Sequence, residues 1–135
     1  MRAPVVMDSS AMIAIALAEP RARLAEEAIR AHPRGCFILS IHAYEVAAKL
    51  TEKGIDLPGA WRAATFGGVR MVNLVTAKMA FRAAEIKMAR RDLSLGDCHC
   101  LAFAEGMNGC LLTTDGRMAE FAAGNVMDLE TIHLH

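Results

Sequence analysis

The chain alternates short, continuously apolar segments with longer segments of helical periodicity, and this alternation most constrains its fold. Continuously apolar segments are typical of strands that are buried on both faces, as in parallel sheets. They lie at residues 4–8, 36–39, 69–74, 109–113 and 125–129. Helices are expected at residues 9–17, 21–31, 40–53, 57–66, 76–91 and 93–106, and after Asp115. The sequence therefore predicts an α/β fold, with one domain over residues 1–135 and a central parallel sheet of four to five strands covered by helices on both faces.

The composition and length limit the cellular environment in which we expect this chain. Its 135 residues are enough to form one core without disulfides. Hydrophobic residues make up 54% of the chain, but the longest unbroken apolar run, residues 11–18, is too short to cross a bilayer. The first residues lack the layout of a signal peptide, because Asp8 interrupts a short apolar run. We therefore expect a cytoplasmic protein with no membrane partner.

The charge of the chain is balanced. Fifteen basic and fifteen acidic residues give zero formal net charge at pH 7. This balance argues against a protein that coats nucleic acid by bulk electrostatics. A high apolar content with so little net charge favours self-association, as a homodimer or a higher oligomer.

The four cysteines lie inside apolar segments, and we expect them to be buried, reduced thiols. Cys98 and Cys100 are two residues apart on an expected helix. Residues at this spacing point to different faces of a helix, so they are poorly placed to bind one zinc ion together.

Four acidic residues lie where this fold would bring them to one edge of the sheet. Asp8 ends the first strand and Asp115 follows the fourth, while Asp97 begins the helix that leads into the fourth strand. Glu45 lies in the second turn of the helix after the second strand. Ligands of open parallel sheets bind beyond the carboxyl ends of the strands. We therefore expect the four carboxylates to meet in one pocket.

Each acid also has a purely structural interpretation. Asp8 and Asp115 are placed to be N-caps, and Asp97 can form a capping box with Ser94. Glu45 can be a solvated residue paired with Lys49 one turn later. Helix caps alone, however, give no reason to gather four carboxylates at one edge.

The electrostatic repulsion within such a pocket indicates what it binds. Two unit charges about 4 Å apart repel by roughly 4 kcal/mol at an effective dielectric of 20. A cluster of carboxylates therefore needs a cation or shifted pKa values. Oxygen ligands without Cys or His favour Mg²⁺ or Mn²⁺. Because such an ion can activate a water and hold a phosphodiester, the pattern indicates phosphodiester hydrolysis.

The four segments that carry these acids read VVMDSSAMIAIAL, IHAYEVAAKL, SLGDCHCLAFAEG and GCLLTTDGRMAEF. Together they resemble the acidic motifs of PIN-domain ribonucleases, and specifically of the VapC toxins of bacterial toxin–antitoxin pairs. The resemblance covers nearly the whole chain in order and spacing, and it is weakest over residues 54–75. It implies a PIN-like fold for residues 1–135.

The resemblance also implies a site and an activity. The implied catalytic residues and ligands of a divalent metal, Mg²⁺ or Mn²⁺, are Asp8, Glu45, Asp97 and Asp115, with Ser10 and Thr113 supporting the carboxylates by hydrogen bonds. The implied activity is that of a metal-dependent endoribonuclease acting as a toxin. The implied partners are an RNA substrate, a cognate antitoxin whose tail enters the acidic groove, and a second copy of the chain.

Other functions stay open at this point. A housekeeping RNA-processing PIN nuclease would carry the same residues, and a catalytically silent PIN protein would act as a binding scaffold. A phosphate-signalling receiver domain would need a lysine after a late strand, which is missing here. Nucleophilic hydrolysis is disfavoured because the sequence holds no Gly-x-Ser-x-Gly segment.

Two surface features have alternative interpretations as well. The basic residues over positions 78–91 are interpreted first as a solvated helix face and second as a track for RNA phosphates. Tyr44, beside Glu45, is expected to pack in the core rather than to stack on a base. His133 and His135 are expected to be frayed or to lie along an edge.

Overall fold

The computed structural model describes residues 3–32, 35–64, 68–73, 75–124, 127 and 129–135. It contains one five-stranded sheet in the order β3-β2-β1-β4-β5, and every pair of neighbouring strands is parallel. The strands are β1 (Val5–Met7), β2 (Cys36–Leu39), β3 (Val69–Val72), β4 (Cys110–Thr113) and β5 (Glu130–His133). The predicted α/β fold with a parallel sheet is confirmed.

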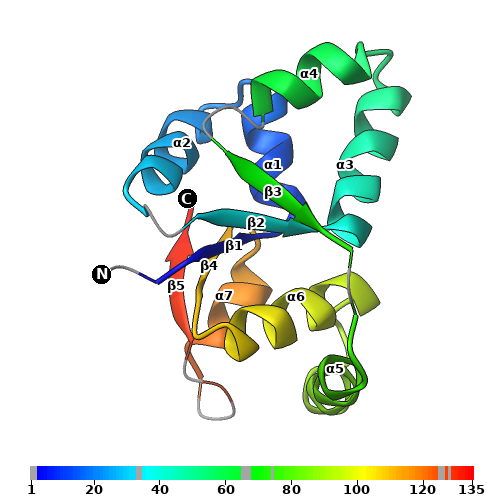
Figure 1. Ribbon diagram of the computed structural model, residues 1–135, viewed down its shortest axis with the longest axis vertical. Coiled ribbons are helices and arrows are strands. Elements are labelled where there is room, and N and C mark those ends of the chain that lie inside the picture. The colour runs from blue at the N-terminus through cyan, green and yellow to red at the C-terminus, as the bar shows by residue number, and fades with distance from the viewer. Residues whose placement is uncertain (1–2, 33–34, 65–67, 74, 125–126, 128) are drawn as a thin grey trace.

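Helices cover both faces of this sheet (Figure 1). On one side lie α1 (Ser9–Ala16), α2 (Ala22–Arg30), α3 (Ser40–Glu52) and α4 (Leu57–Ala64). On the other side lie α5 (Ala77–Ala89), α6 (Leu95–Gly106) and α7 (Gly116–Ala122). In the described part of the chain, none of these helices combines the length and the apolar character needed to cross a membrane.

The strands alternate their side chains between two cores, as the twofold period of a strand requires. Val5 and Leu112 pack with α1 and α2 in one core, whereas Val6 and Leu111 pack with α6 and α7 in the other. Since both faces are covered, the inner strands are apolar throughout, which is why their segments stand out in the sequence. All four cysteines are free and buried, as expected.

One predicted strand is wrong. The fifth strand is Glu130–His133 and not residues 125–129, of which 125, 126 and 128 lie outside the described residues. Met127 and Leu129 are buried in the core of α6 and α7 without belonging to a strand. The true strand is the edge of the sheet, where one side of the backbone needs no partner and the side chains are polar or half-buried. An apolar run is therefore a poor marker for it.

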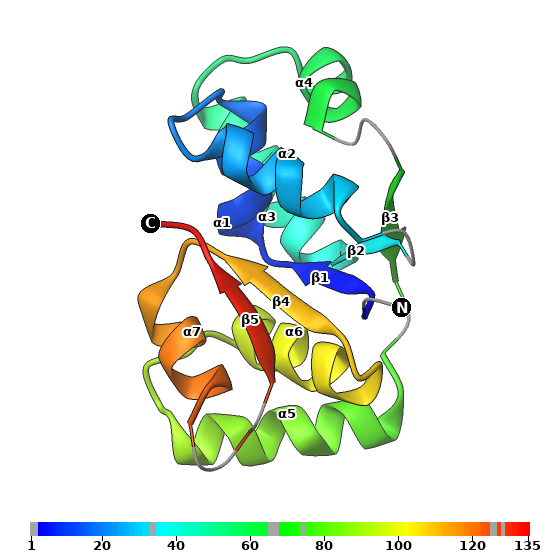
Figure 2. The same ribbon diagram turned by 90° about the vertical axis from the view of Figure 1, so that its left-hand side faces the viewer.

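The strand order fixes where a ligand would lie. From β1 the chain first builds outward through β2 and β3, and it then returns to build β4 and β5 on the other side. This reversal makes the carboxyl ends of β1 and β4 a topological switch point, which is the usual place of a binding crevice in such sheets. Figure 2 shows β1 and β4 side by side, with α1 and α7 following them.

Candidate active site

Asp8 follows β1 and is the N-cap of α1, and its side chain is almost fully buried. Its Oδ1 accepts hydrogen bonds from the Ala11 amide at 3.0 Å and from the Ser10 hydroxyl at 2.7 Å. Its Oδ2 accepts a hydrogen bond from the Thr113 hydroxyl. Burial raises the pKa of this carboxyl, and the hydrogen bonds from Thr113, Ser10 and Ala11 oppose that rise only in part.

Ser10 and Thr113 connect this carboxylate to the turn after β4. Each hydroxyl donates to Asp8, and each hydroxyl oxygen also accepts from a backbone amide. The Thr114 amide donates to Ser10 Oγ at 3.0 Å, and the Asp115 amide donates to Thr113 Oγ1 at 2.8 Å. Because both hydroxyl hydrogens are directed at Asp8, the network favours the ionised carboxylate as its acceptor.

Asp115 lies just beyond β4 and is the N-cap of α7. Its Oδ1 accepts from the Arg117 amide at 2.8 Å, and its Oδ2 lies 3.5 Å from Arg117 Nη2. The guanidinium of Arg117 is about half exposed and also lies 3.5 Å from the Asp92 carbonyl oxygen. A cation therefore stands at the rim of the acidic region. The sequence shows that Arg117 follows Asp115 by two residues, but this spacing alone does not indicate that the Arg117 side chain folds back onto the Asp115 carboxylate.

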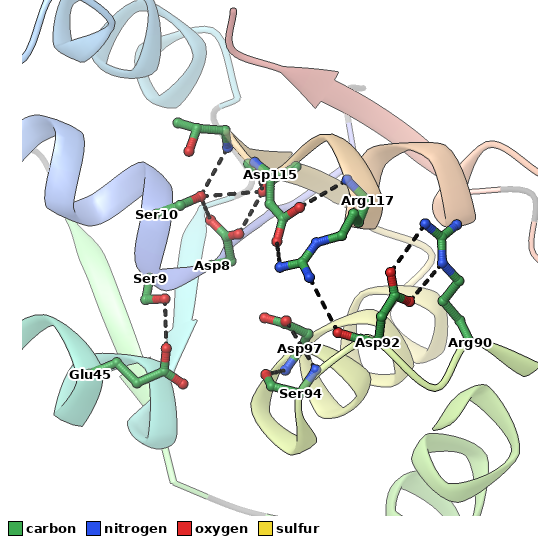
Figure 3. Close-up of polar contacts among 12 residues, drawn as sticks. Asp8, Ser9, Ser10, Glu45, Arg90, Asp92, Ser94, Asp97, Asp115 and Arg117 are labelled. Atoms are coloured by element: carbon green, nitrogen blue, oxygen red, sulfur yellow. Dashed lines mark hydrogen bonds and ion pairs between the residues drawn. The ribbon is translucent and has the colours of Figure 1, made fainter. Parts of the chain in front are cut away.

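Asp97 lies in the first turn of α6 and completes a capping box with Ser94. Ser94 Oγ accepts from the Asp97 amide at 3.1 Å, and Asp97 Oδ2 accepts from the Ser94 amide at 3.3 Å. This bond engages one oxygen of the carboxylate. Figure 3 shows the Asp97 carboxylate on the side of α6 that faces Asp8 and Asp115.

Glu45 is held against α1 and α6. Its Oε2 accepts from the Ser9 hydroxyl at 2.9 Å, and a Cβ added at Gly96 would lie only 2.9 Å from its Oε1. The glycine that precedes Asp97 therefore makes room for Glu45. Hydrogen bonds from His42 and Ser9 lower the pKa of Glu45, with the His42 contribution the larger, although partial burial acts in the other direction.

His42 is a buried residue that the sequence analysis did not single out. Its Nε2 lies 3.0 Å from the Gly96 carbonyl oxygen, and its Nδ1 lies 3.3 Å from the Ser9 amide and 3.6 Å from Glu45 Oε1. The neutral ring accepts from the Ser9 amide, whereas the charged ring donates to Glu45. Burial lowers the pKa of His42, but Cys100, Glu45 and Asp8 outweigh burial and raise it. The histidine thus ties α1, α3 and α6 together beneath the site.

The four acidic side chains lie around a common space between α1, α3, α6 and α7 (Figure 3). Among the described residues, no three of these carboxylates have oxygens within 4.8 Å of each other. Asp8, Asp97 and Asp115 also cap helices. Each of them therefore has the structural role expected from the sequence and also lies beside the common space.

The residues fit a hard divalent cation that keeps part of its water shell. All four offer carboxylate oxygens, and Asp8 retains acceptor capacity beyond its three hydrogen bonds. Mg²⁺ commonly binds proteins through one or two carboxylates and several waters. These carboxylates would hold such an ion together with part of its water shell.

The basic face of α5 is largely paired within the protein. Arg82 binds Glu105 and Glu85, and Arg90 binds Asp92 and Glu120. Lys87 donates to the carbonyl oxygens of Arg91 and Leu93. These contacts favour the interpretation as a solvated helix face over that of a phosphate track.

Tyr44 does not pack in the core, contrary to expectation. Its side chain is 71% exposed, because α3 turns the neighbouring residues His42, Ala43 and Val46 inward. The tyrosine precedes Glu45 on the same helix and is free to contact a molecule bound at the site.

Solved structures with the same fold include proteins of toxin–antitoxin systems. A toxin–antitoxin complex from Klebsiella pneumoniae is similar over 97% of this chain and 98% of its own, at 21% identity and a TM-score of 0.68. VapC20 of Mycobacterium tuberculosis, a toxin that cleaves the sarcin–ricin loop, is similar over 93% of this chain and 98% of its own, at 21% identity and a TM-score of 0.67. VapBC2 of Rickettsia felis, bound to a DNA fragment from its promoter, is similar over 98% of this chain and 99% of its own, at 12% identity and a TM-score of 0.70.

No curated protein sequence matches this chain significantly. At identities this low, the likeness to the solved structures concerns the fold. The sequence model of the PIN domain matches residues 5–124, which is most of the chain. The chain therefore belongs to the PIN domain family.

Proposed function

We propose that this protein is a metal-dependent endoribonuclease that acts as the toxin of a toxin–antitoxin pair. The observation that carries the proposal is the position of four carboxylates, Asp8, Glu45, Asp97 and Asp115, around one space at the switch point of a PIN fold. Of the similar structures, one is a toxin–antitoxin complex, one is VapBC2 bound to a DNA fragment from its promoter, and one is a toxin that cleaves the sarcin–ricin loop. These similar proteins support RNA as the substrate and an antitoxin as the partner.

The four carboxylates would hold Mg²⁺ or Mn²⁺. When bound, such an ion lowers the pKa of a coordinated water and neutralises charge on the phosphodiester. Asp8 gives the most rigid ligand, because two hydroxyls and an amide fix both of its oxygens. Ser10 and Thr113 act as supporting residues, since they fix Asp8 relative to the turn that carries Asp115.

The outer residues would orient the RNA. The guanidinium of Arg117 is exposed enough to contact a phosphate while it stays near Asp115. The lowered pKa of Glu45 keeps this residue as a carboxylate, which would be available to a bound divalent ion. Tyr44 offers an exposed ring beside Glu45, on which an unpaired base can stack.

A homodimer is part of this proposal. Apolar side chains of Ile41, Val75 and Leu95 are exposed and line a groove of about 210 Å³ between the start of α3 and the start of α6. A second copy of the chain would cover them. Sedimentation of the purified protein over a range of concentrations tests this, and a Leu95→Asp variant would shift the equilibrium toward monomer.

The activity is tested by cleavage of total cellular RNA by the purified protein. We expect discrete fragments with Mg²⁺ or Mn²⁺, none with a chelator, and none with Asp8→Asn or Asp97→Asn. Asp92→Asn is the matched control, because Asp92 is an exposed acid nearby that pairs with Arg90. Equal loss of cleavage in the Asp92 variant would contradict the assignment of the site.

Two other functions predict different results. A housekeeping RNA-processing nuclease would cleave RNA with the same metal and residue dependence, but its expression would not arrest growth. A silent PIN scaffold would leave every RNA intact under all conditions. Growth arrest that is lost in the Asp97→Asn variant therefore separates the toxin from both alternatives.

A further inference from the structure

A second group of metal-binding side chains lies at the opposite end of the sheet from the four acids. Ligand atoms of His32, Cys110 and Glu130 all lie within 4.8 Å of one another. We propose that these three residues form a zinc site at the amino ends of β4 and β5. The site is separate from the proposed nuclease centre and does not depend on that function.

The parallel register brings two of the ligands together. Cys110 is the first residue of β4 and Glu130 is the first residue of β5, and the two are direct partners in the ladder. Register partners in parallel strands point to the same face of the sheet. Thr113, which supports Asp8, is three residues further along β4, about 10 Å away at the usual rise of a strand.

The third ligand comes from the helix that covers this face. Cys110 has the same parity as Leu112, which packs in the core formed with α1 and α2. His32 follows α2 directly and is buried, with 4% of its surface exposed. The imidazole is therefore delivered onto the face to which Cys110 and Glu130 point.

The hydrogen bond of His32 determines which ring nitrogen is available to bind a metal. Its Nδ1 lies 2.6 Å from the Ala28 carbonyl oxygen, and because a carbonyl can only accept, Nδ1 carries the hydrogen. The Nε2 then holds the free lone pair. Metal-bound histidines characteristically donate their other ring N–H to a backbone carbonyl or a carboxylate in this way.

The donor set selects the ion. A thiolate, an imidazole and a carboxylate together suit Zn²⁺, whereas Mg²⁺ and Ca²⁺ take oxygen ligands. In a tetrahedral zinc site, ligand atoms of these three kinds are roughly 3.3–3.5 Å apart, given Zn–N and Zn–O lengths of about 2.0 Å and a Zn–S length of about 2.3 Å. The present separations are within 4.8 Å, so they exceed this by about 1.5 Å at most. Glu130 is exposed, and its carboxylate can move by that amount without disturbing the core.

Cobalt(II) gives the sharpest test, because it replaces zinc and shows a charge-transfer absorption band only when a thiolate binds it. We expect the purified protein, freed of metal, to develop this band and to saturate at one equivalent, and we expect zinc to displace it. Cys110→Ala should abolish the band. Glu130→Gln, an exposed substitution that leaves the core intact, should weaken cobalt binding at least tenfold.

Two control variants separate this site from the rest of the molecule. Cys98→Ala removes a buried thiol from α6 and should leave the band unchanged. Asp115→Asn alters the acidic site and should also leave it unchanged. Absence of the band in the wild-type protein, its persistence in Cys110→Ala, or unchanged cobalt affinity in Glu130→Gln would each overturn the proposal.

Discussion

Asp8 is the residue whose environment most directly opposes its charge. Its folded pKa is raised above the ordinary value because burial outweighs the hydrogen bonds to the carboxylate. The native state therefore binds more protons than the unfolded state between the two pKa values. Stability then falls as the pH rises through this range, and the full penalty remains above the folded pKa.

An Asp8→Asn variant has no such ionisation. We expect its melting temperature, relative to that of the wild type, to rise as the pH is raised above the ordinary pKa of an aspartate, about 4, in the presence of a chelator. Thermal unfolding followed by circular dichroism at several pH values measures this difference. A difference that stays constant with pH would show that the buried carboxylate carries no penalty.

A substitution at Gly96 is expected to affect the stability of the fold and the geometry of the acidic site differently. Alanine favours a helix over glycine by up to about 1 kcal/mol, but a Cβ at this position would lie 2.9 Å from Glu45 Oε1. The carboxylate can swing away, and it would then lose its present contacts with Ser9 and His42. We expect Gly96→Ala to unfold within about 1 kcal/mol of the wild type in urea and to cleave RNA at least tenfold more slowly.

Gly106 provides the matched control for this substitution. It ends the same helix, and a Cβ there would meet nothing within 4 Å. Gly106→Ala should therefore keep wild-type cleavage. If Gly96→Ala also keeps it, the position of Glu45 has no part in the reaction.

At the residue scale, the sequence marks the acids but not their supports. Asp8, Asp97 and Asp115 stand at strand ends or a helix start, and the rules for parallel sheets are sufficient to place them at one edge. His42 is different, because it lies 54 residues from Gly96 and 33 from Ser9 in the sequence. Only the tertiary fold, which brings the start of α3 next to the starts of α1 and α6, places these groups together, and no local pattern encodes it.

At the scale of elements, the first turn of α6 both caps the helix and carries Asp97 of the proposed metal site. The Ser94 hydroxyl accepts from the Asp97 amide, and the Ser94 backbone amide donates to one oxygen of the Asp97 carboxylate. Ser94→Ala removes a bond of the kind that contributes about 1 kcal/mol. The amide that binds the Asp97 carboxylate remains in this variant, but the Asp97 amide loses its hydrogen bond to the Ser94 hydroxyl. We expect the loss of stability in urea unfolding, together with weaker stabilisation by Mn²⁺, because the first turn that carries Asp97 is held less firmly.

Thr76→Ala is the control, since Thr76 caps the neighbouring α5 through the Met79 amide. Its loss of unfolding free energy should be similar, but the response to Mn²⁺ should not change. Equal responses of the two variants to Mn²⁺ would mean that Asp97 does not contribute to metal binding.

The elements themselves differ in how well their sequences reveal them. The buried strands β1, β2 and β4 are short apolar runs, and the amino-terminal cap of α6 is readable as Ser-x-x-Asp. The edge strand β5 lacks an apolar run, because its residues are only partly buried. Its position depends on pairing with β4, which is a tertiary interaction that periodicity does not report.

At the scale of the whole molecule, many of the basic side chains are paired with acidic groups of the same chain. Three of the five basic residues over positions 78–91 bind groups of the protein itself, namely Arg82, Lys87 and Arg90. In the described part of the chain, Lys78 and Arg91 have no side-chain partner from this set of contacts. Together with Arg117, they leave few cations on this side of the molecule for phosphates.

This distribution predicts a weak dependence of RNA binding on salt. Each phosphate neutralised on a single strand contributes about −0.7 to the slope of log K against log salt concentration, so about three contacts give a slope near −2. Fluorescence anisotropy of a single-stranded RNA, measured in chelator to prevent cleavage, determines this slope. A slope of about −5 or steeper would require at least seven contacts, and the basic face of α5 would then bind RNA after breaking its internal pairs. A shallow slope together with metal-dependent cleavage would mean that the protein cleaves RNA without binding it through the basic face of α5.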